Sequence, residues 1–162
     1  MAYYSSMTFL WGTGIMKLLF CIVLLLMLPA ISTAAGEAAV VGHIQTLQGS
    51  VWIERGALRL GGEAGSEVRQ GDILRTGKPG AVGLVLLDNT TVSLGSGSEL
   101  VVRDYAFQPR EGKFTLVMQM LKGSFSYVSG LIGKLAPDAI RLQLPEATIA
   151  VRGTKLLVEI GD

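Results

Sequence analysis

Apolar residues recur in short runs from position 43 to position 160, and turn-forming residues separate these runs. Between positions 140 and 144 apolar and polar residues alternate, so Ile140, Leu142 and Leu144 share one face, as in a half-buried strand. Other runs with strand-like composition cover 51–55, 84–87, 99–103, 114–120, 125–128 and 155–160, and a less regular one covers 148–151. The pattern predicts a chain built from short β-strands.

Glycine, proline and asparagine mark the turns between the runs, at 61–62, 70–72, 78–80, 88–89, 95–97, 110–112 and 122–123. Many short strands with such turns are typical of an antiparallel β-sandwich or β-roll. The 21 glycines agree with this, because tight turns repeatedly need positive φ. Only 129–135 has helical character, and its two glycines limit it to a mobile connection or a single turn. We therefore expect an all-β fold.

The N-terminal segment has the features of a secretory signal peptide. Lys17 is followed by eleven apolar residues, Pro29 and a run of mostly small residues that ends at Ala35. The apolar run is shorter than the roughly 20 residues of a spanning helix. We predict a signal peptide over 1–35, cleaved after Ala34 or Ala35, and one β-domain over 36–162. An uncleaved signal anchor is the alternative, and translation can also begin at Met16.

Composition narrows the function classes. The single cysteine, Cys21, lies inside the apolar run behind the bulky Phe20, which argues against lipidation, and cleavage removes it. Disulfides, thiol catalysis and cysteine-based metal sites are then excluded from the mature chain. Without Lys17, 13 of the 14 basic residues remain beside 13 acidic ones, with the signs interspersed. Nucleic acid is therefore not an expected partner, because its binding needs a basic stripe.

Catalytic and cofactor motifs are missing from the sequence. It contains no Gly-x-Ser-x-Gly elbow, no phosphate-binding loop and no acidic calcium loop, and His43 is its one histidine. We expect no catalytic residues, no metal site, no cofactor and no enzymatic activity. Trp52, which lies in a predicted strand, is interpreted as a core residue rather than a binding platform.

Two turns carry acidic residues that we interpret as structural. Gly71 is expected to adopt a backbone angle that is costly for other residues, and Asp72 to accept hydrogen bonds from nearby backbone N–H groups. The alternative for Asp72 is an acid catalyst or a metal ligand. At the second turn Asp88 precedes Asn89, and asparagine tolerates the left-handed conformation better than other residues with a side chain.

Three segments in a fixed order resemble the FecR domain family. They are 70–77 (QGDILRTG), 86–94 (LLDNTTVSL) and 144–154 (LPEATIAVRGT). The resemblance covers roughly residues 44–162, and Asn89 stands where the family usually has glycine. The matching positions are Gly71, Asp72, Thr76, Gly77, Asp88, Arg152, Gly153 and Thr154.

The resemblance implies a sensing or interaction module on the envelope side of the membrane. Some members join a cytoplasmic sigma-factor-binding segment and a membrane span to the domain, whereas others are exported proteins with little else. Residues 1–15, which precede Met16 and Lys17, carry no charge and are too few for a cytoplasmic segment, so the chain is similar to the second kind. We expect a periplasmic or secreted protein that binds a protein or an envelope polymer. One alternative is an inner-membrane-anchored sensor of a sigma-factor pathway. The other is a polysaccharide-active enzyme.

Arg152 is expected to be partly buried and therefore to need carboxylate or carbonyl partners. We predict that it clamps the turn carrying Asp72 or Asp88, and the alternative is a recognition residue. A second hypothesis concerns an apolar patch made by Phe114, Met118, Met120, Phe125 and Tyr127. If exposed, the patch would dock a partner, since methionine-rich surfaces accept varied partners. The alternative is burial of both faces of these strands.

The segment 155–160 is the last predicted strand, and Gly161-Asp162 has the composition of a turn that begins after it. Family members commonly continue into a returning strand. We therefore expect a domain truncated at this side, in which 155–160 forms an unpaired edge open to strand addition from another chain.

Overall fold

The structure is a computed structural model that describes residues 37–151 and 155–161. The predicted signal peptide over 1–35 and the motif residues Arg152, Gly153 and Thr154 lie outside the described residues. Glu37–Asp162 forms one compact unit.

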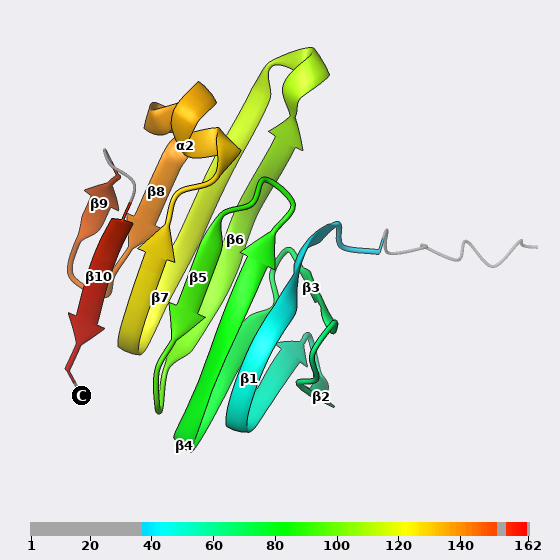
Figure 1. The fold of residues 1–162 in the computed structure, drawn as a ribbon, viewed down its shortest axis with the longest axis vertical. Helices are drawn as coiled ribbons and strands as arrows, with labels where there is room; N and C mark the ends of the chain where they lie inside the picture. The colour runs from blue at the N-terminus through cyan, green and yellow to red at the C-terminus, as the bar shows by residue number, and fades with distance from the viewer. Residues whose placement is uncertain (1–36, 152–154, 162) are drawn as a thin grey trace, which may run out of the picture. The chain divides into compact units, whose positions relative to one another are not determined.

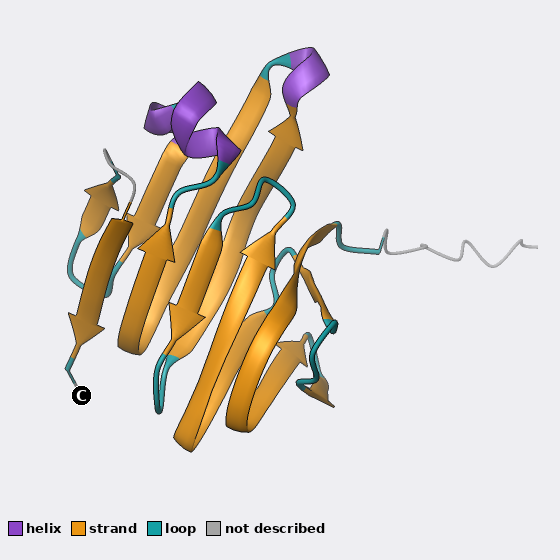
Figure 2. Ribbon diagram, viewed as in Figure 1, coloured by secondary structure: helices purple, strands orange, loops and turns teal. Residues whose placement is uncertain are grey.

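Strands dominate the described residues, as Figures 1 and 2 show, and the all-β prediction is confirmed. The α-helix found among these residues has five residues, as expected for a single turn. In chain order the elements are β1 (Val40–Arg55), β2 (Leu58–Gly61), β3 (Glu67–Arg69), β4 (Ile73–Leu86), β5 (Thr91–Leu94), β6 (Glu99–Gln108), η1 (Pro109–Glu111), β7 (Lys113–Val128), α2 (Leu131–Leu135), η2 (Pro137–Ala139), β8 (Ile140–Gln143), β9 (Thr148–Ala150) and β10 (Lys155–Ile160).

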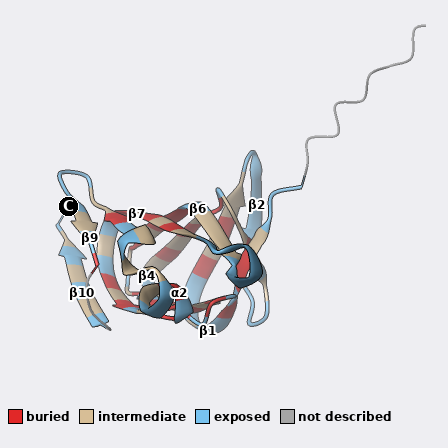
Figure 3. Ribbon diagram, turned by 90° about the horizontal axis from the view of Figure 1, so that it is seen from above, coloured by how far each residue is buried: buried red, intermediate tan, exposed pale blue. Residues whose placement is uncertain are grey.

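The strands form one sheet that folds over into two facing layers. Residues 82–85 of β4 pair with β5, whereas residues 73–75 of the same strand pair with β6. β7 likewise pairs with β5 through 125–128 and with β6 through 113–122. These four strands therefore close a ring, which Figure 3 shows from above. The pairings are antiparallel except that of β7 with β8, which is parallel.

Each long strand contributes one half to each layer. Layer A consists of β3, residues 40–48 of β1, residues 81–86 of β4, β5, residues 124–128 of β7, and β10. Layer B consists of β2, residues 51–55 of β1, residues 73–76 of β4, β6, residues 113–122 of β7, β8 and β9.

Glycines allow the long strands to bend from one layer into the other. Gly49 in β1 has φ of 65°, and a Cβ there would lie 2.4 Å from the carbonyl oxygen of Pro79 in β4. Gly123 in β7 has φ of 91°, and a Cβ there would lie 2.6 Å from Cα of Ser98. Only glycine meets both demands, because it tolerates positive φ and leaves room for the neighbouring backbone.

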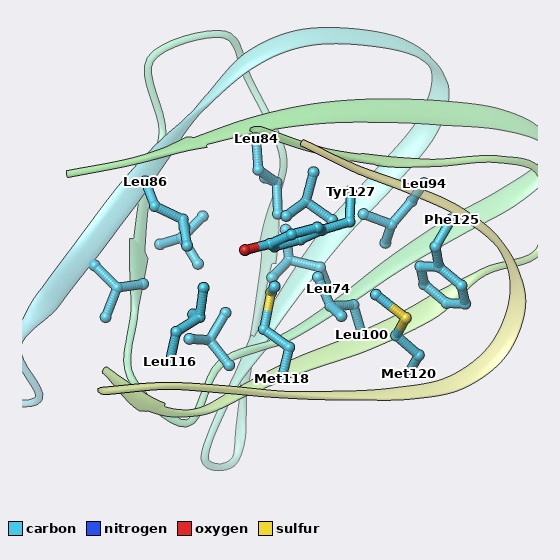
Figure 4. Packing of buried hydrophobic residues seen from close by; sticks show 14 of the residues in the cluster. Leu74, Leu84, Leu86, Leu94, Leu100, Leu116, Met118, Met120, Phe125 and Tyr127 are labelled. Atoms are coloured by element: carbon cyan, nitrogen blue, oxygen red, sulfur yellow. The ribbon is translucent and has the colours of Figure 1, made fainter. Parts of the chain in front are cut away.

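The core lies between the two layers. Inward-pointing side chains from both layers pack there, and Ile132 of α2 joins them. Figure 4 shows Tyr127 in the middle of this cluster. The largest fully buried side chains are Tyr127, Ile44, Ile53, Leu74, Leu84, Leu86, Leu94, Leu100, Leu116, Met118, Met120 and Ile132.

Candidate functional site

Asp72 ties the end of β1 to the turn between β3 and β4. Its side chain is buried and accepts two hydrogen bonds from Arg55, at 2.9 Å from Nε and 2.7 Å from Nη2. Oδ2 also accepts the backbone N–H of Arg69 at 2.8 Å, which confirms the predicted capping of the turn. Gly71 has φ of 86°, as expected. The hydrogen bond from Arg55 to Asp72 raises the pKa of the guanidinium, since it favours the charged form.

Thr76 and Gly77 lie at the corner where β4 crosses from layer B to layer A. The Thr76 hydroxyl donates to the carbonyl of Gly95 at 2.6 Å and accepts the N–H of Ser98 at 2.8 Å. The Gly77 carbonyl accepts the N–H of Gly97 at 3.0 Å. These bonds fasten β4 to the turn between β5 and β6. Thr76 and Gly77 thus hold two strands and a turn together at this corner.

Ser98 extends the same corner to β7. Its hydroxyl donates to the carbonyl of Ser124 at 3.2 Å and accepts the N–H of Ser124 at 3.1 Å. Ser98 is buried, so these bonds satisfy groups that water does not reach. The sequence pattern did not single out Ser98, because its glycine-rich surroundings indicated only a turn.

Asp88 is fully buried at the turn between β4 and β5. Its carboxylate accepts hydrogen bonds from the Thr90 hydroxyl at 2.7 Å, from the N–H groups of Thr90 and Ile132 at 3.2 Å each, and from the Tyr105 hydroxyl at 3.3 Å. Asn89 has φ of 63°, which confirms the predicted left-handed position. Asp88 thus joins its own turn to α2 and β6.

The predicted clamp by Arg152 remains a prediction, because Arg152, Gly153 and Thr154 lie outside the described residues. The two carboxylates proposed as its partners already have strong donors. Asp72 has the Arg55 guanidinium, and Asp88 has hydroxyl and backbone donors.

The predicted docking patch is corrected by the structure. Met118, Met120 and Tyr127 are fully buried and Phe125 is 3% exposed, so these four residues belong to the core. The inward positions of β7 have even numbers before Gly123 and odd numbers after it, because the bend shifts the alternation by one residue. Phe114 is half-buried and packs against Phe107, with ring centroids 6.2 Å apart. Burial, the alternative interpretation, accounts for the methionines.

A row of side chains crosses the outer face of layer B. Strand register aligns Trp52 of β1 with Arg75 of β4, Arg75 with Glu99 of β6, and Glu99 with Lys122 of β7. Trp52 lies between the buried residues Val51 and Ile53 and is half-buried, so its position corrects the interpretation as a core residue. We call these four residues the layer B row. The sequence did not predict it, because its members are distant in the chain.

Opposite charges and an aromatic ring organise the layer B row. Arg75 donates from Nη1 toward Glu99 at 2.7 Å, and its Nε lies 3.1 Å from a carboxylate oxygen of Glu54. The guanidinium carbon of Arg59 lies 4.2 Å from the centre of the Trp52 ring, a cation–π contact. A surface hollow of about 250 Å³ runs along the row and is lined by Trp52, Arg75, Thr76, Gly77, Lys78, Gly97, Ser98, Glu99 and Lys122.

Residues 37–151 and 155–161 contain no group of three or more His, Cys, Asp or Glu side chains placed to hold a metal ion. In the same part of the chain, no helix has the length and apolar character needed to cross a membrane.

Comparison with known proteins indicates the family. The model of the family described as FecR protein matches residues 72–162, which include the turn at Asp72, the corner at Thr76-Gly77 and the turn at Asp88. A solved structure titled "Cell surface anchoring domain" aligns with 40% of this chain and 83% of its own, at 29% identity and a TM-score of 0.36. No curated protein matches the chain.

Proposed function

Because the chain belongs to the FecR family, we propose that it is a non-catalytic, exported domain that works by binding another protein of the cell envelope. The layer B row is the observation that supports this proposal. It combines a half-buried tryptophan, over which Arg59 stacks, with the ion-paired Arg75 and alternating charges on a sheet face. Tryptophan and arginine are the residues most enriched among the energetically dominant contacts of protein interfaces.

The chemistry of the row favours a protein over a uniformly charged polymer. Positive and negative groups alternate along it, from Arg75 to Glu99 to Lys122. A complementary protein surface can match alternating signs, whereas a polyanion would meet repulsion at Glu99 and Glu54.

Retention experiments test this surface. We expect the immobilised protein to retain an envelope partner, and the variants Trp52→Ala and Arg59→Glu to weaken that retention by about tenfold or more. Ser126→Ala, on the outer face of layer A, is the matched control and should bind as the unaltered protein does. Circular dichroism verifies folding of each variant. Equal retention by all variants would show that the partner does not bind at the layer B row.

Processing of the N-terminus tests the exported form. We expect N-terminal sequencing of the protein recovered from cells to begin at Ala35 or Gly36, as signal-peptide cleavage requires. An intact N-terminus at Met1 or Met16 would instead favour the membrane-anchored sensor. Turnover of an envelope polysaccharide by the purified protein would contradict the non-catalytic proposal.

A further inference from the structure

Exposed apolar side chains gather at one end of the sheet. Four of the seven large hydrophobic side chains that are exposed in the described part of the chain lie in α2 or in the strand ends and turns beside it. They are Leu87 (55% exposed), Val128 (39%), Leu131 (38%) and Leu135 (58%), and we call them the apolar end. Figure 1 shows α2 at the end toward which the arrows of β4 and β7 point.

Hydrogen bonds to one buried residue hold the apolar end together. The N–H of Leu131 donates to the backbone carbonyl of Asp88 at 2.7 Å. The N–H of Ile132 donates to the carboxylate of the same aspartate at 3.2 Å. Because Asp88 directly follows Leu87, these bonds fix the turn that carries Leu87 to the start of α2. The apolar end is therefore a preformed surface rather than a set of independent side chains.

The short helix α2 presents one side to the core and one side to solvent. Ile132 is fully buried and joins the core cluster. Leu131 and Leu135 are four positions apart, so they lie on the same side of the helix, and both are exposed. Their exposure adds nothing to the stability of the fold. Grouped apolar side chains of this kind mark a contact site for a protein or a membrane.

The composition of the apolar end favours a membrane over a protein. Its four members are leucine and valine, which are under-represented among the dominant contacts of protein interfaces, whereas tryptophan, tyrosine and arginine are enriched there. Lys134 and Asp138, in α2 and in the 3-10 helix that follows it, are both exposed and have opposite charges. Attraction at this end therefore comes from apolar burial rather than from net charge. A lipid surface accepts aliphatic side chains without a matching shape.

The chain enters the domain at the same end. The N–H of Leu87 donates to the carbonyl of Val41 at 2.9 Å, so the start of β1 lies beside the apolar end. The apolar run 18–28 precedes β1 in the sequence, and the segment 29–39 between them can span at most about 40 Å. In both expected forms of this run, a signal peptide before cleavage and an anchor, it occupies a membrane. The apolar end is then the part of the domain from which the chain leads to the bilayer.

We propose that the apolar end rests on a lipid membrane, with Leu87, Leu131 and Leu135 entering the boundary between headgroups and acyl chains. The contact is weak and reversible, because a few leucines bury about as much apolar surface as one acyl chain, which alone binds membranes only marginally. This inference goes beyond the proposed function. Arg75 of the layer B row lies beside the corner at Thr76, whereas Leu87 follows the other end of the layer A half of β4. The row therefore stays accessible to a partner.

Site-specific fluorescence tests which residues enter the lipid. An environment-sensitive fluorophore is attached to a single cysteine in a Cys21→Ser background, at Leu87→Cys or Leu135→Cys. Vesicles of phosphatidylethanolamine and phosphatidylglycerol should shift the emission of both labels to the blue and strengthen it. Ser96→Cys, at an exposed residue in the turn between β5 and β6, is the control and should show no shift. The label reports its own surroundings, so the reading holds with or without the apolar run 18–28.

Co-sedimentation with vesicles measures the strength of the contact for protein recovered from cells without its signal peptide. Leu135→Asp should lower the partition coefficient by about tenfold or more, since it removes one buried leucine and adds a charge. Leu58→Asp is the matched control, because Leu58 is 63% exposed but lies in β2, which pairs only with β1. Uncharged phosphatidylcholine vesicles should bind the unaltered protein about as well as anionic ones. Circular dichroism verifies the folding of each variant.

Four results would overturn membrane contact through the apolar end. One is a label at Leu135 that stays in a water-like environment when vesicles are added. Another is an equal loss of binding in Leu58→Asp and Leu135→Asp. The third is binding to anionic vesicles alone that salt abolishes, which would assign the attraction to charge. The fourth is a blue shift at Leu135 that rises with protein concentration without vesicles, which would show that a second copy covers this end. None of them bears on retention of a partner by Trp52, so this inference and the proposed function fail separately.

Discussion

Two buried carboxylates are stabilised in different ways. Asp72 faces a guanidinium, and the two groups make a bidentate pair at the edge of the core. Asp88 instead accepts hydrogen bonds from hydroxyl and backbone donors. Removing the counter-charge from Asp72 leaves a buried anion, whereas no single substitution does the same to Asp88. The stability of the fold therefore depends more strongly on the single partner of Asp72 than on any one partner of Asp88.

We expect Arg55→Ala to lower the free energy of unfolding by about 3 kcal/mol, because it leaves the carboxylate of Asp72 buried without its partner. Urea unfolding followed by circular dichroism measures the change. Asp72→Asn in the Arg55→Ala background should recover part of the loss. Lys113→Ala, which breaks an exposed ion pair with Glu111, is the control and should cost at most about 1 kcal/mol. A loss below about 1 kcal/mol for Arg55→Ala would contradict the role of Arg55 as the partner that stabilises the buried carboxylate of Asp72.

Backbone conformations and turn caps were predictable where they depend on residues close in the sequence. The positive φ of Gly71 and Asn89 and the capping by Asp72 follow from neighbours within three residues. Arg55 was not identified as the partner of Asp72, because 17 residues separate them and only the pairing of β1 with β3 and β4 brings them together. The same limit applies to Tyr105 and Asp88, which are also 17 residues apart.

At the scale of elements, two predicted turns proved to be bends inside continuous strands. Residues 78–80 lie within β4 and residues 122–123 lie within β7. Glycine and proline favour turns in isolation, but here pairing with neighbouring strands continues on both sides of each bend. Strand existence was predictable from alternation. Strand length was not, because tertiary pairing overrides local preference at these positions.

The bend in β7 can be tested against a glycine with similar backbone geometry. Gly123 has φ of 91° and faces Ser98, whereas Gly65 has φ of 88° and has open space where a Cβ would be. We expect Gly65→Ala to cost about 1–2 kcal/mol from backbone strain alone. Gly123→Ala should cost at least about 3 kcal/mol, because it adds a steric clash with the backbone of Ser98.

Thermal or urea unfolding of both variants measures this difference. Equal destabilisation by the two substitutions would show that the approach of β7 to Ser98 is looser than described. The hydrogen bonds between Ser98 and Ser124 give a second readout, since amide exchange at Ser124 should accelerate in Gly123→Ala but not in Gly65→Ala.

At the scale of the whole molecule, both described tyrosines are held neutral by the fold. Burial raises the pKa of Tyr105, and the charge of Asp88 raises it further. Burial also raises the pKa of Tyr127 from its ordinary value of 10.0. A raised folded-state pKa means that the folded protein holds the proton more tightly than the unfolded chain does. Its stabilising effect is complete below pH 10.0 and is lost as the pH rises through the folded-state values.

We therefore expect the unfolding free energy to fall progressively above pH 10.0. Absorbance at 295 nm should report tyrosinate formation by these two residues together with loss of the β-sheet circular dichroism signal. Tyr105→Phe removes one of the two groups and should make the alkaline decline shallower. Tyrosinate formation near pH 10.0 in a protein that keeps its β-sheet signal would contradict this expectation.

Because β1, β4 and β7 each pass through both layers, no contiguous portion of the polypeptide before Val128 contains a finished layer. A ribosome or translocation channel that delivers the chain from its N-terminus therefore releases strands whose partners have not yet emerged. Neither layer can therefore be completed before β7 and the strands after it are available for pairing.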